Sequence, residues 1–283
     1  MQIIKSNKDL QEYLSGIEKQ GLSIGFVPTM GALHEGHLSL ISEAADENDI
    51  VVCSIFVNPT QFNKPDDLKH YPRVIEKDID LLKAEKCDVV FNPSVEEIYP
   101  EDEPDEHQFD FEGLDEVMEG KSRPGHFQGV ATVVKRLFQI VNPTRAYFGL
   151  KDYQQMVIIH HMIQKLKLSV EIIPCPIVRE ESGLAMSSRN ELLSDIELKQ
   201  AALIRSTMKV VKIRSGFATI TETKKFVTKQ FAKNKYLELE YFEIVDMYSL
   251  KPLSTWAQSN NVIACIAVWA GKVRLIDNII LFS

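Results

Sequence analysis

Apolar runs of strand length recur through the first 180 residues. The run at 49–57 is almost continuously apolar, which is typical of a strand buried on both faces of a parallel sheet. Further runs at 24–27, 87–91, 145–149 and 170–178 are separated by stretches that are long enough for helices. Alternating strands and helices predict an α/β fold built on a doubly wound parallel sheet.

The stretches between these runs carry apolar residues at helical spacing. Leu10, Leu14 and Ile17 lie four and three positions apart after the capping candidates Ser6 and Asn7, which favours a helix over residues 6–20. The same reasoning predicts further helices over residues 34–48, 74–85, 130–140 and 149–167.

The pattern changes after residue 178. Ser194 with Glu197 and Thr219 with Glu222 have the spacing of capping boxes, which predicts helices over residues 195–214 and 220–234. Three strands follow, with a hairpin turn at 269–271 between the last two; they are expected over residues 239–245, 262–268 and 272–281. The chain is therefore expected to form a domain of residues 1–178 and a smaller α+β domain of residues 179–283.

Composition excludes several classes of protein. The 283 residues are 45% hydrophobic and 25% charged, with a net charge of −8, which argues against a nucleic-acid partner held through its phosphates. No apolar run approaches the roughly 18–20 residues that span a bilayer, and the first residues lack the apolar core of a signal peptide. We expect neither a nucleic acid nor a membrane as partner.

Acidic residues are concentrated between Glu96 and Glu119, where there are twelve Asp or Glu and no Lys or Arg. A solvated acidic loop region is the commoner meaning of such a run, although a metal site is the alternative. The four cysteines are widely separated and form no Cys-x-x-Cys pair. Buried reduced thiols in a cytosolic protein are therefore expected, and neither a disulfide framework nor a zinc site.

Candidate chemistry begins directly after the first predicted strand. That strand breaks at Pro28 and Gly31, and a helix starts near His34, Gly36 and His37. A helix start offers unpaired backbone N–H groups and a positive dipole end, which suit a phosphate. The two histidines share one face of the first turn, and Gly36 lets a ligand approach the backbone. These features predict a nucleotide site, with a loop carrying two surface histidines as the alternative.

A second glycine-to-helix segment repeats this arrangement after the strand at 145–149. Gly149 is followed by Lys151, whose charge suits a phosphate, and by Asp152, whose carboxylate can accept hydrogen bonds from ribose hydroxyls. Gln155 lies four positions after Lys151 and shares its helix face.

Three other loops carry polar candidates. Gln61 follows the carboxyl end of a strand, where ligands bind in open α/β sheets, and its amide can both donate and accept. Arg123 and His126 are candidate anion contacts, with a plain surface role as the alternative. The cluster Met186-Ser187-Ser188-Arg189 combines hydroxyls with a guanidinium, a donor set that suits a polyphosphate.

Taken together, these motifs resemble the pantothenate synthetase (pantoate–β-alanine ligase) family of the His-x-Gly-His nucleotidyltransferase superfamily. The resemblance runs in order through nearly the whole chain and is most specific between residues 24 and 190. The segments that carry it are residues 26–37, 58–62, 71–73, 123–130, 147–155 and 183–190.

The resemblance implies a Rossmann-like domain that binds nucleotide and pantoate, and a smaller domain that closes over the ATP site. It implies a cytoplasmic homodimer and an AMP-forming carbon–nitrogen ligase of pantothenate and coenzyme A biosynthesis. ATP and pantoate would form pantoyl adenylate and release pyrophosphate, and β-alanine would then displace AMP. Mg²⁺ would accompany ATP, and the loops at 58–67 and 182–188 are the expected lids.

The resemblance also implies roles for individual residues. His34, His37 and Lys151 would be catalytic, with the histidines stabilising the phosphates and His37 donating a proton. Gln61 and Gln155 would bind pantoate, and β-alanine would arrive at Gln61. The resemblance places ATP against Met30, Gly31, Ala32, Leu33, His34, Glu35, Gly36, His37, Gly149, Leu150, Lys151, Asp152, Val178, Met186, Ser187, Ser188 and Arg189. It leaves the magnesium ligands unassigned, with Asp78 as a possible outer contact.

Other interpretations share part of this pattern. Another His-x-Gly-His nucleotidyltransferase would couple ATP or CTP to a different acceptor. A class I aminoacyl-tRNA synthetase has the same two-histidine chemistry, but this chain is short and acidic for a tRNA partner. A catalytically silent nucleotide-binding module is the non-enzymatic alternative, and the presence of both histidines, Lys151 and Arg189 weighs against it.

Overall fold

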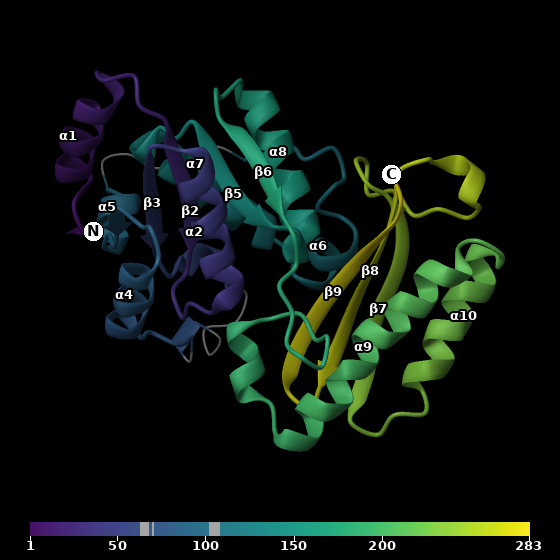
Figure 1. Cartoon of the computed structure of the whole chain (residues 1–283). Helices are drawn as coiled ribbons and strands as arrows, with labels where there is room; N and C mark the ends of the chain where they lie inside the picture. Colours follow the sequence, from purple (N-terminus) through teal and green to yellow (C-terminus); the bar gives the residue numbers. More distant parts are fainter. Residues whose placement is uncertain (63–67, 70, 102–107) are drawn as a thin grey trace. The chain divides into compact units, whose positions relative to one another are not determined.

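A computed structural model of the chain describes residues 1–62, 68–69, 71–101 and 108–283 (Figure 1). These residues form two compact units with separate hydrophobic cores. Unit 1 comprises Met1–Asp115, Arg123–Leu150 and Gln155–Pro176, and unit 2 comprises Glu116–Ser122, Lys151–Gln154 and Ile177–Ser283.

Unit 1 is built on a parallel sheet. Within the described residues its six strands have the order β1-β4-β3-β2-β5-β6. They are β1 Gln2–Ile4, β2 Ile24–Thr29, β3 Ile50–Ile55, β4 Val89–Phe91, β5 Arg145–Gly149 and β6 Glu171–Cys175. From β2 the chain proceeds to β3 and β4 on one side, and later to β5 and β6 on the other. This reversal between β2 and β5 is the switch point at which open α/β sheets bind ligands.

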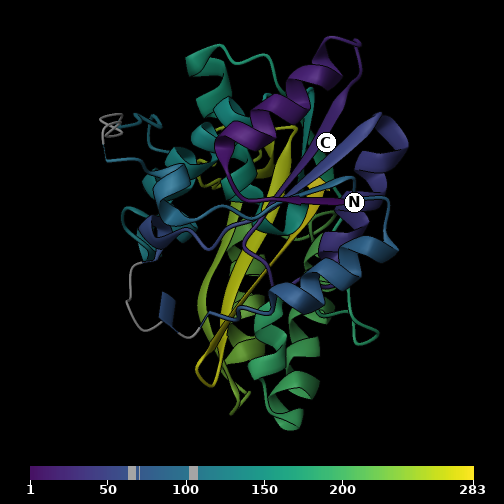
Figure 2. The same cartoon turned by 90° about the vertical axis from the view of Figure 1, so that its left-hand side faces the viewer.

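Helices cover both faces of this sheet, as the doubly wound prediction requires (Figures 1 and 2). Leu38 and Ile41 of α2 belong to the core cluster on one face. On the other face Phe26 of β2 meets Phe138 of α7 edge to face, with ring centroids 6.2 Å apart. The helical elements are α1 Asn7–Glu18, α2 Glu35–Glu47, η1 Pro59–Gln61, α4 Ile75–Ala84, α5 Val95–Ile98, α7 His126–Val141 and α8 Tyr153–Leu166, preceded by η2 Leu150–Asp152.

Unit 2, whose residues are all described, contains the antiparallel sheet β7-β8-β9. Its elements are α6 Met118–Ser122, η3 Ser188–Leu192, α9 Asp195–Arg214, α10 Ile220–Phe231, β7 Leu237–Asp246, η4 Trp256–Gln258, β8 Val262–Ala270 and β9 Val273–Phe282. Both predicted capping boxes are present, with Ser194 and Thr219 as the N-caps. Met208 of α9, Val227 of α10 and Ile266 of β8 are fully buried in its core. The expected small α+β unit is therefore confirmed.

The structure corrects two local predictions and adds one strand. Strand β2 continues through Pro28 to Thr29; β5 pairs only with Gly25 and Phe26, so the proline lies beyond the part of β2 that is paired on both sides. Helix α7 begins at His126, directly after Gly125, whose φ is +79°, and not near residue 130. Strand β1 was not predicted, because its three residues carry no periodicity and are fixed by parallel pairing with β4.

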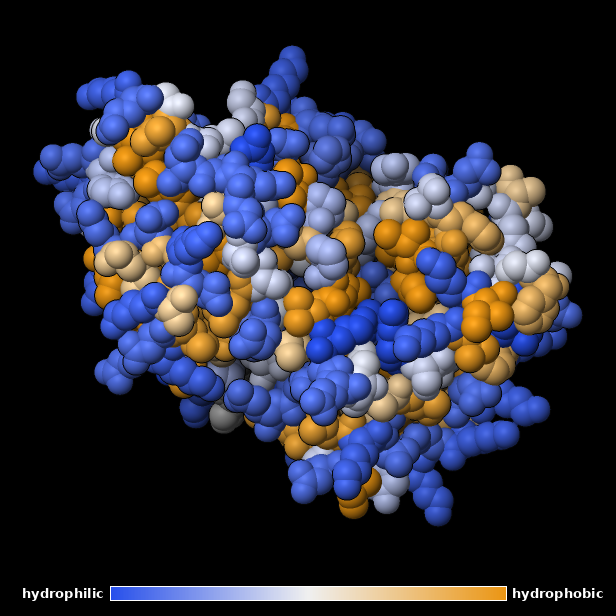
Figure 3. Space-filling model, viewed as in Figure 1, coloured by the Kyte–Doolittle hydropathy of each residue, from blue (hydrophilic) through white to orange (hydrophobic). Residues whose placement is uncertain are grey.

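The described helices include none that is long and apolar enough to cross a membrane. Figure 3 shows hydrophilic side chains over most of one face, with hydrophobic groups scattered between them.

Candidate active site

The turn between β2 and α2 is held by a carboxylate of another helix. Gly31 and Ala32 both have positive φ, +79° and +50°. Asp78 of α4 is 1% exposed, and its Oδ2 and Oδ1 accept the N–H groups of Ala32 at 2.9 Å and Leu33 at 2.7 Å. A Cβ on Gly31 would lie 2.9 Å from Asp78 Oδ2. Asp78, considered above only as an outer magnesium contact, therefore shapes the turn that is predicted to bind the nucleotide.

The two histidines form the N-terminal cap of α2. His34 is the N-cap, and its Nδ1 accepts the N–H of Gly36 at 3.1 Å. His37 Nδ1 accepts the N–H of His34 at 3.3 Å, and the two ring centroids are 4.1 Å apart. Since both Nδ1 atoms accept hydrogen bonds, each neutral ring carries its proton on Nε2. The helix start therefore presents two imidazole N–H groups in addition to its own backbone donors.

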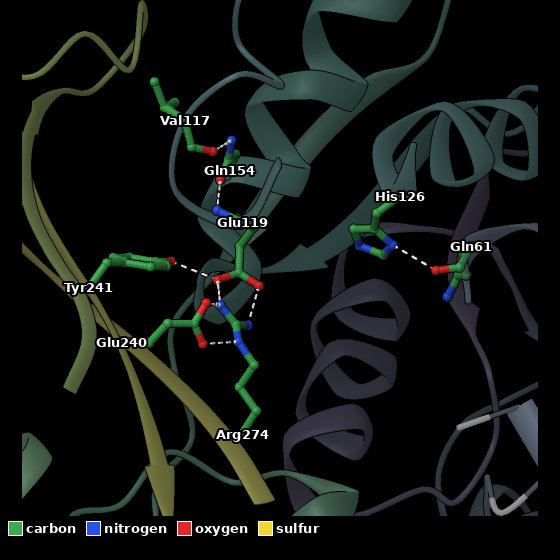
Figure 4. Close-up of polar contacts among 8 residues, drawn as sticks. All are labelled: Gln61, Val117, Glu119, His126, Gln154, Glu240, Tyr241 and Arg274. Carbon is green, nitrogen blue, oxygen red and sulfur yellow. Dashed lines mark hydrogen bonds and ion pairs between the residues drawn. The ribbon is translucent and has the colours of Figure 1, made fainter. Parts of the chain in front are cut away.

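Gln61 lies at the end of η1 in contact with another predicted site residue. Its side chain is 9% exposed, its Nε2 donates to Met30 Sδ, and its Oε1 accepts from Asn58 at 3.3 Å. His126 Nδ1 lies 3.0 Å from the Gln61 carbonyl oxygen, as Figure 4 shows. The structure thus brings Met30, Gln61 and His126 together, although they are far apart in the sequence.

Asn58 is a supporting residue that sequence reasoning missed. It is 1% exposed, and its Nδ2 donates to Gly129 O of α7 at 3.1 Å. Its Oδ1 accepts from the Tyr99 hydroxyl at 2.8 Å. Asn58 therefore fixes η1, and Gln61 with it, against α7. Of the loop expected to act as a lid, residues 63–67 lie outside the described residues, so that role stays a prediction.

In unit 2, Lys151 and Asp152 lie in η2 at the carboxyl end of β5. Burial lowers the pKa of the half-buried Lys151, and the positive charge of Arg189 lowers it further, against the opposing effect of Asp152 and Asp277. The structure therefore brings two predicted phosphate ligands, Lys151 and Arg189, within electrostatic reach of each other. Two mutually repelling cations favour an anion between them. Gly149, Leu150 and Gln155 belong to unit 1.

The remaining predicted nucleotide residues lie on one hairpin. The Val178 carbonyl accepts the N–H of Met186 at 3.0 Å, and Arg179 pairs with Ala185 as an antiparallel bridge. Ser187 caps η3, with its Oγ accepting the N–H of Arg189 at 3.3 Å. Val178 and the cluster 186–189 are thus adjacent in space as well as in sequence. Movement of the 182–188 loop stays a prediction.

A second cluster that sequence reasoning missed surrounds Glu119 of α6 (Figure 4). Glu119 was assigned to a solvated acidic run, yet it is 9% exposed, and its carboxylate accepts from Arg274 at 2.6 and 2.8 Å and from the Tyr241 hydroxyl at 2.7 Å. Arg274 also binds Glu240 at 2.6 Å. Burial opposes ionisation of Glu240, but its hydrogen bonds and the charge of Arg274 outweigh burial and lower its pKa. Gln154 accepts the Glu119 N–H at 2.9 Å, so this cluster supports the segment that carries Lys151.

All four cysteines are free and buried, as predicted. Burial raises the pKa of the Cys87 and Cys175 thiols to about 12, which makes them poor nucleophiles. Among the residues that the structure describes, no group of three or more His, Cys, Asp and Glu side chains is placed to hold a metal ion.

A doubly wound parallel sheet whose β2 strand leads into a His-x-Gly-His helix start defines a nucleotide-binding enzyme of the nucleotidyltransferase type. The model of the family described as "Pantoate-beta-alanine ligase" matches residues 2–280. The chain belongs to the pantoate–β-alanine ligase family, as its sequence motifs predict.

Relatives of this family match over nearly the full chain. The pantothenate synthetase of Bacteroides fragilis is 50% identical over 279 residues, which cover 99% of this chain and 98% of the relative. The pantothenate synthetase of Phocaeicola vulgatus is 50% identical over 280 residues and 99% of both chains. A solved pantothenate synthetase from Thermus thermophilus is 39% identical, with a TM-score of 0.91 and complete coverage of both chains.

One solved relative was crystallised with ligands. It is a pantoate-β-alanine ligase from Francisella tularensis, in complex with "Beta-gamma ATP and Beta-alanine". It is 37% identical, has a TM-score of 0.80 and matches over 99% of this chain and 98% of its own. The chain is accordingly a carbon–nitrogen ligase of ATP-dependent pantothenate synthesis.

Proposed function

We propose that this chain joins pantoate to β-alanine in two steps. A carboxylate oxygen of pantoate first attacks the α-phosphorus of ATP, and pyrophosphate leaves to give enzyme-bound pantoyl adenylate. The amine of β-alanine then attacks the acyl carbon and loses a proton, and AMP leaves to give pantothenate. Such displacements need positioning and charge neutralisation more than a strong base, and the site residues described above suit that requirement.

The observation that carries the proposal is the orientation of the two histidines. Both Nδ1 atoms accept backbone N–H groups, so the protons lie on the Nε2 atoms. Two N–H donors at the positive end of α2 stabilise the negative charge that develops on the departing pyrophosphate. We assign proton donation to His37 in the form of a hydrogen bond from its Nε2–H to the departing pyrophosphate, because a ring whose Nδ1 accepts the His34 N–H has no second proton to transfer.

We assign nucleotide contacts to residues of each unit by itself. In unit 1 these are residues 30–37 and 149–150. In unit 2, Lys151 binds a phosphate, Asp152 a ribose hydroxyl, the Val178 backbone adenine, and residues 186–189 the phosphates. The electrostatic proximity of Lys151 and Arg189 supports the assignment, because a polyphosphate relieves their repulsion.

Pantoate is proposed to bind Gln61 and Gln155. The Gln61 Nε2 donates to the Met30 thioether, which is a weak acceptor. A hydroxyl or carboxylate of pantoate is a stronger acceptor, so the Gln61 amide forms a stronger hydrogen bond when pantoate takes the place of Met30. We place β-alanine beside Gln61, where its amine reaches the acyl carbon.

Magnesium, assembly and location complete the proposal. We propose that Mg²⁺ enters with ATP and is held chiefly by its phosphates, as is usual for this ion. Both Asp78 oxygens already accept backbone N–H groups, which leaves Asp78 as an outer contact at most. A cytoplasmic homodimer is proposed from family membership, and the free, buried cysteines suit a reducing compartment.

The test is exchange of labelled pyrophosphate into ATP with a panel of acids. The proposal expects exchange that requires pantoate and proceeds without β-alanine. Exchange driven by an amino acid or another hydroxy acid, or the absence of exchange with pantoate, would refute it.

A further inference from the structure

Two consecutive residues of β9 contact both unit 2 segments to which nucleotide binding is proposed. Asp277 is 2% exposed and binds Arg179 through two parallel hydrogen bonds, Nη1 to Oδ2 and Nη2 to Oδ1, each 2.8 Å. Asn278 donates from Nδ2 to the Lys151 carbonyl at 3.0 Å. The two segments, which contain Lys151 and Arg179, are not adjacent in the sequence, and β9 contacts both of them.

The Asp277 contact reaches the hairpin that carries residues 186–189. Arg179 opens this hairpin, and the same Nη1 that binds Asp277 donates to the Gly183 carbonyl at 3.1 Å. Gly183 lies in the turn with φ +87°. The carboxylate thereby fixes both the first strand and the turn of the hairpin. The positive charge of Arg205 on α9 also faces this pair, and Asp277 opposes the repulsion between Arg179 and Arg205.

The Asn278 contact reaches the other phosphate ligand. Its backbone N–H donates to Asp277 Oδ1 at 2.8 Å, which joins the Asp277 carboxylate to the Asn278 backbone. The residues after Lys151 also contact other segments of unit 2. The Tyr153 hydroxyl donates to Met247 O at 2.9 Å, and Gln154 donates to Val117 O at 2.9 Å. Asn278 therefore completes a set of contacts that immobilises the backbone on both sides of Asp152.

We propose that Asp277 and Asn278 are positioning residues that set the separation between the Lys151 ammonium and the hydroxyl and guanidinium donors of residues 187–189. Neither is assigned a contact with the nucleotide. Asp277 acts through Arg179 and the hairpin, and Asn278 acts through the Lys151 backbone. This inference rests on the nucleotide roles proposed above. It predicts that both residues govern affinity for ATP without governing affinity for pantoate.

The test compares Asn278→Ala and Asp277→Asn with a matched control. Glu243→Gln neutralises another ion-paired carboxylate of the same sheet, which binds Lys224 of α10 at 2.6 Å and not a residue of either nucleotide segment. Calorimetry with β,γ-methylene ATP should show about tenfold weaker binding for Asn278→Ala, and a larger loss for Asp277→Asn. The KM for ATP should rise in parallel, while the KM for pantoate and the affinity of the control stay at wild-type values.

Thermal unfolding separates positioning from loss of the fold. Asn278→Ala should melt within a few degrees of wild type and still bind the nucleotide weakly. Wild-type affinity in this variant, or an equal rise in the KM for both substrates, would overturn the inference. Failure of the wild-type protein to bind the analogue would instead overturn the proposed nucleotide site, so the two outcomes are distinguishable.

Discussion

His37 is proposed to use its two ring nitrogens for different purposes, and a substitution can separate the two roles. Asparagine places an acceptor near the position of Nδ1, where it can keep the hydrogen bond from the His34 N–H, but it has no group at Nε2. His37→Asn should therefore leave the free energy of unfolding close to wild type and slow pantoate-dependent exchange by about 100- to 1,000-fold. Exchange within a few fold of wild type would show that the Nε2 proton is not used.

Lys151, which is proposed to bind a phosphate, should make nucleotide affinity depend on pH in the alkaline range. Its ammonium must be charged to hold a phosphate, and burial together with Arg189 lowers its pKa from the ordinary value. As the pH rises, ATP affinity should therefore start to decrease at a lower pH than it would for a lysine with the ordinary pKa of 10.5, because the lysine loses its proton earlier. Arg189→Met removes one cause of the lowered pKa, so it should move this fall to higher pH, although affinity at neutral pH decreases. Calorimetric titration with ATP from neutral to strongly alkaline pH measures the pH at which affinity decreases and the direction in which Arg189→Met shifts it.

Sequence reasoning proposed site residues whose chemistry is evident from neighbouring positions, such as the two histidines and Lys151 with Asp152. It missed residues whose partners lie far along the chain. Asp78 accepts a hydrogen bond from a turn that lies 46 positions earlier in the chain. Asn58 donates to a helix residue that lies 71 positions later, and Glu119 pairs with an arginine that lies 155 positions later. A carboxylate or amide in such a position resembles an ordinary polar residue until the fold brings its partner to it.

At the scale of elements, periodicity and capping predicted most helices and strands. The helix α9 begins after its Ser194 cap and ends at Arg214 as expected, because both signals are local. The start of α7 was not predictable in this way, because Gly125 and the Gln-Gly pair that follows are typical of a turn. The helix starts there because residues 126–129 pack against η1, where His126 and Gly129 meet Gln61, Asn58 and Thr60.

Gly129 lets these two elements approach closely. A Cβ at this position would lie 2.5 Å from the Thr60 carbonyl oxygen and 2.9 Å from the Gln61 nitrogen. Gly129→Ala should therefore displace η1, lower the free energy of unfolding by about 1–3 kcal/mol and raise the KM for pantoate, which is proposed to bind Gln61. Urea denaturation and exchange kinetics measure the two effects.

Gly16 supplies the matched control in another helix of the same unit. A Cβ there would meet nothing within 4 Å, so Gly16→Ala should stabilise the protein by about 0.5–1 kcal/mol through helix propensity alone. Similar effects of the two alanine substitutions on stability and on the KM for pantoate would contradict the close packing of α7 on η1.

At the scale of the whole molecule, the order of strands and helices was predictable, but the membership of the units was not. Local patterns divide the chain once, near residue 178. The contacts place two earlier segments, Glu116–Ser122 and Lys151–Gln154, in the unit formed by the C-terminal part of the chain. Both segments are too short to carry a pattern of their own, so long-range contacts such as Glu119–Arg274 and Lys151–Asn278 reveal where they belong.

The segments of the two units alternate along the chain, and this limits which parts can be exchanged between members of the family. A chimera with one crossover at residue 176, taking its C-terminal part from the 50%-identical Bacteroides fragilis relative, would pair Glu119 and Lys151 of one parent with β9 of the other. We expect it to melt below both parents, and a second chimera that also exchanges residues 116–122 and 151–154 to regain part of the difference. Equal melting temperatures would mean that these contacts are interchangeable. If the second chimera melts higher, the part of this enzyme that must be exchanged together consists of three separate segments of the chain. A single crossover cannot transfer all three segments from one parent.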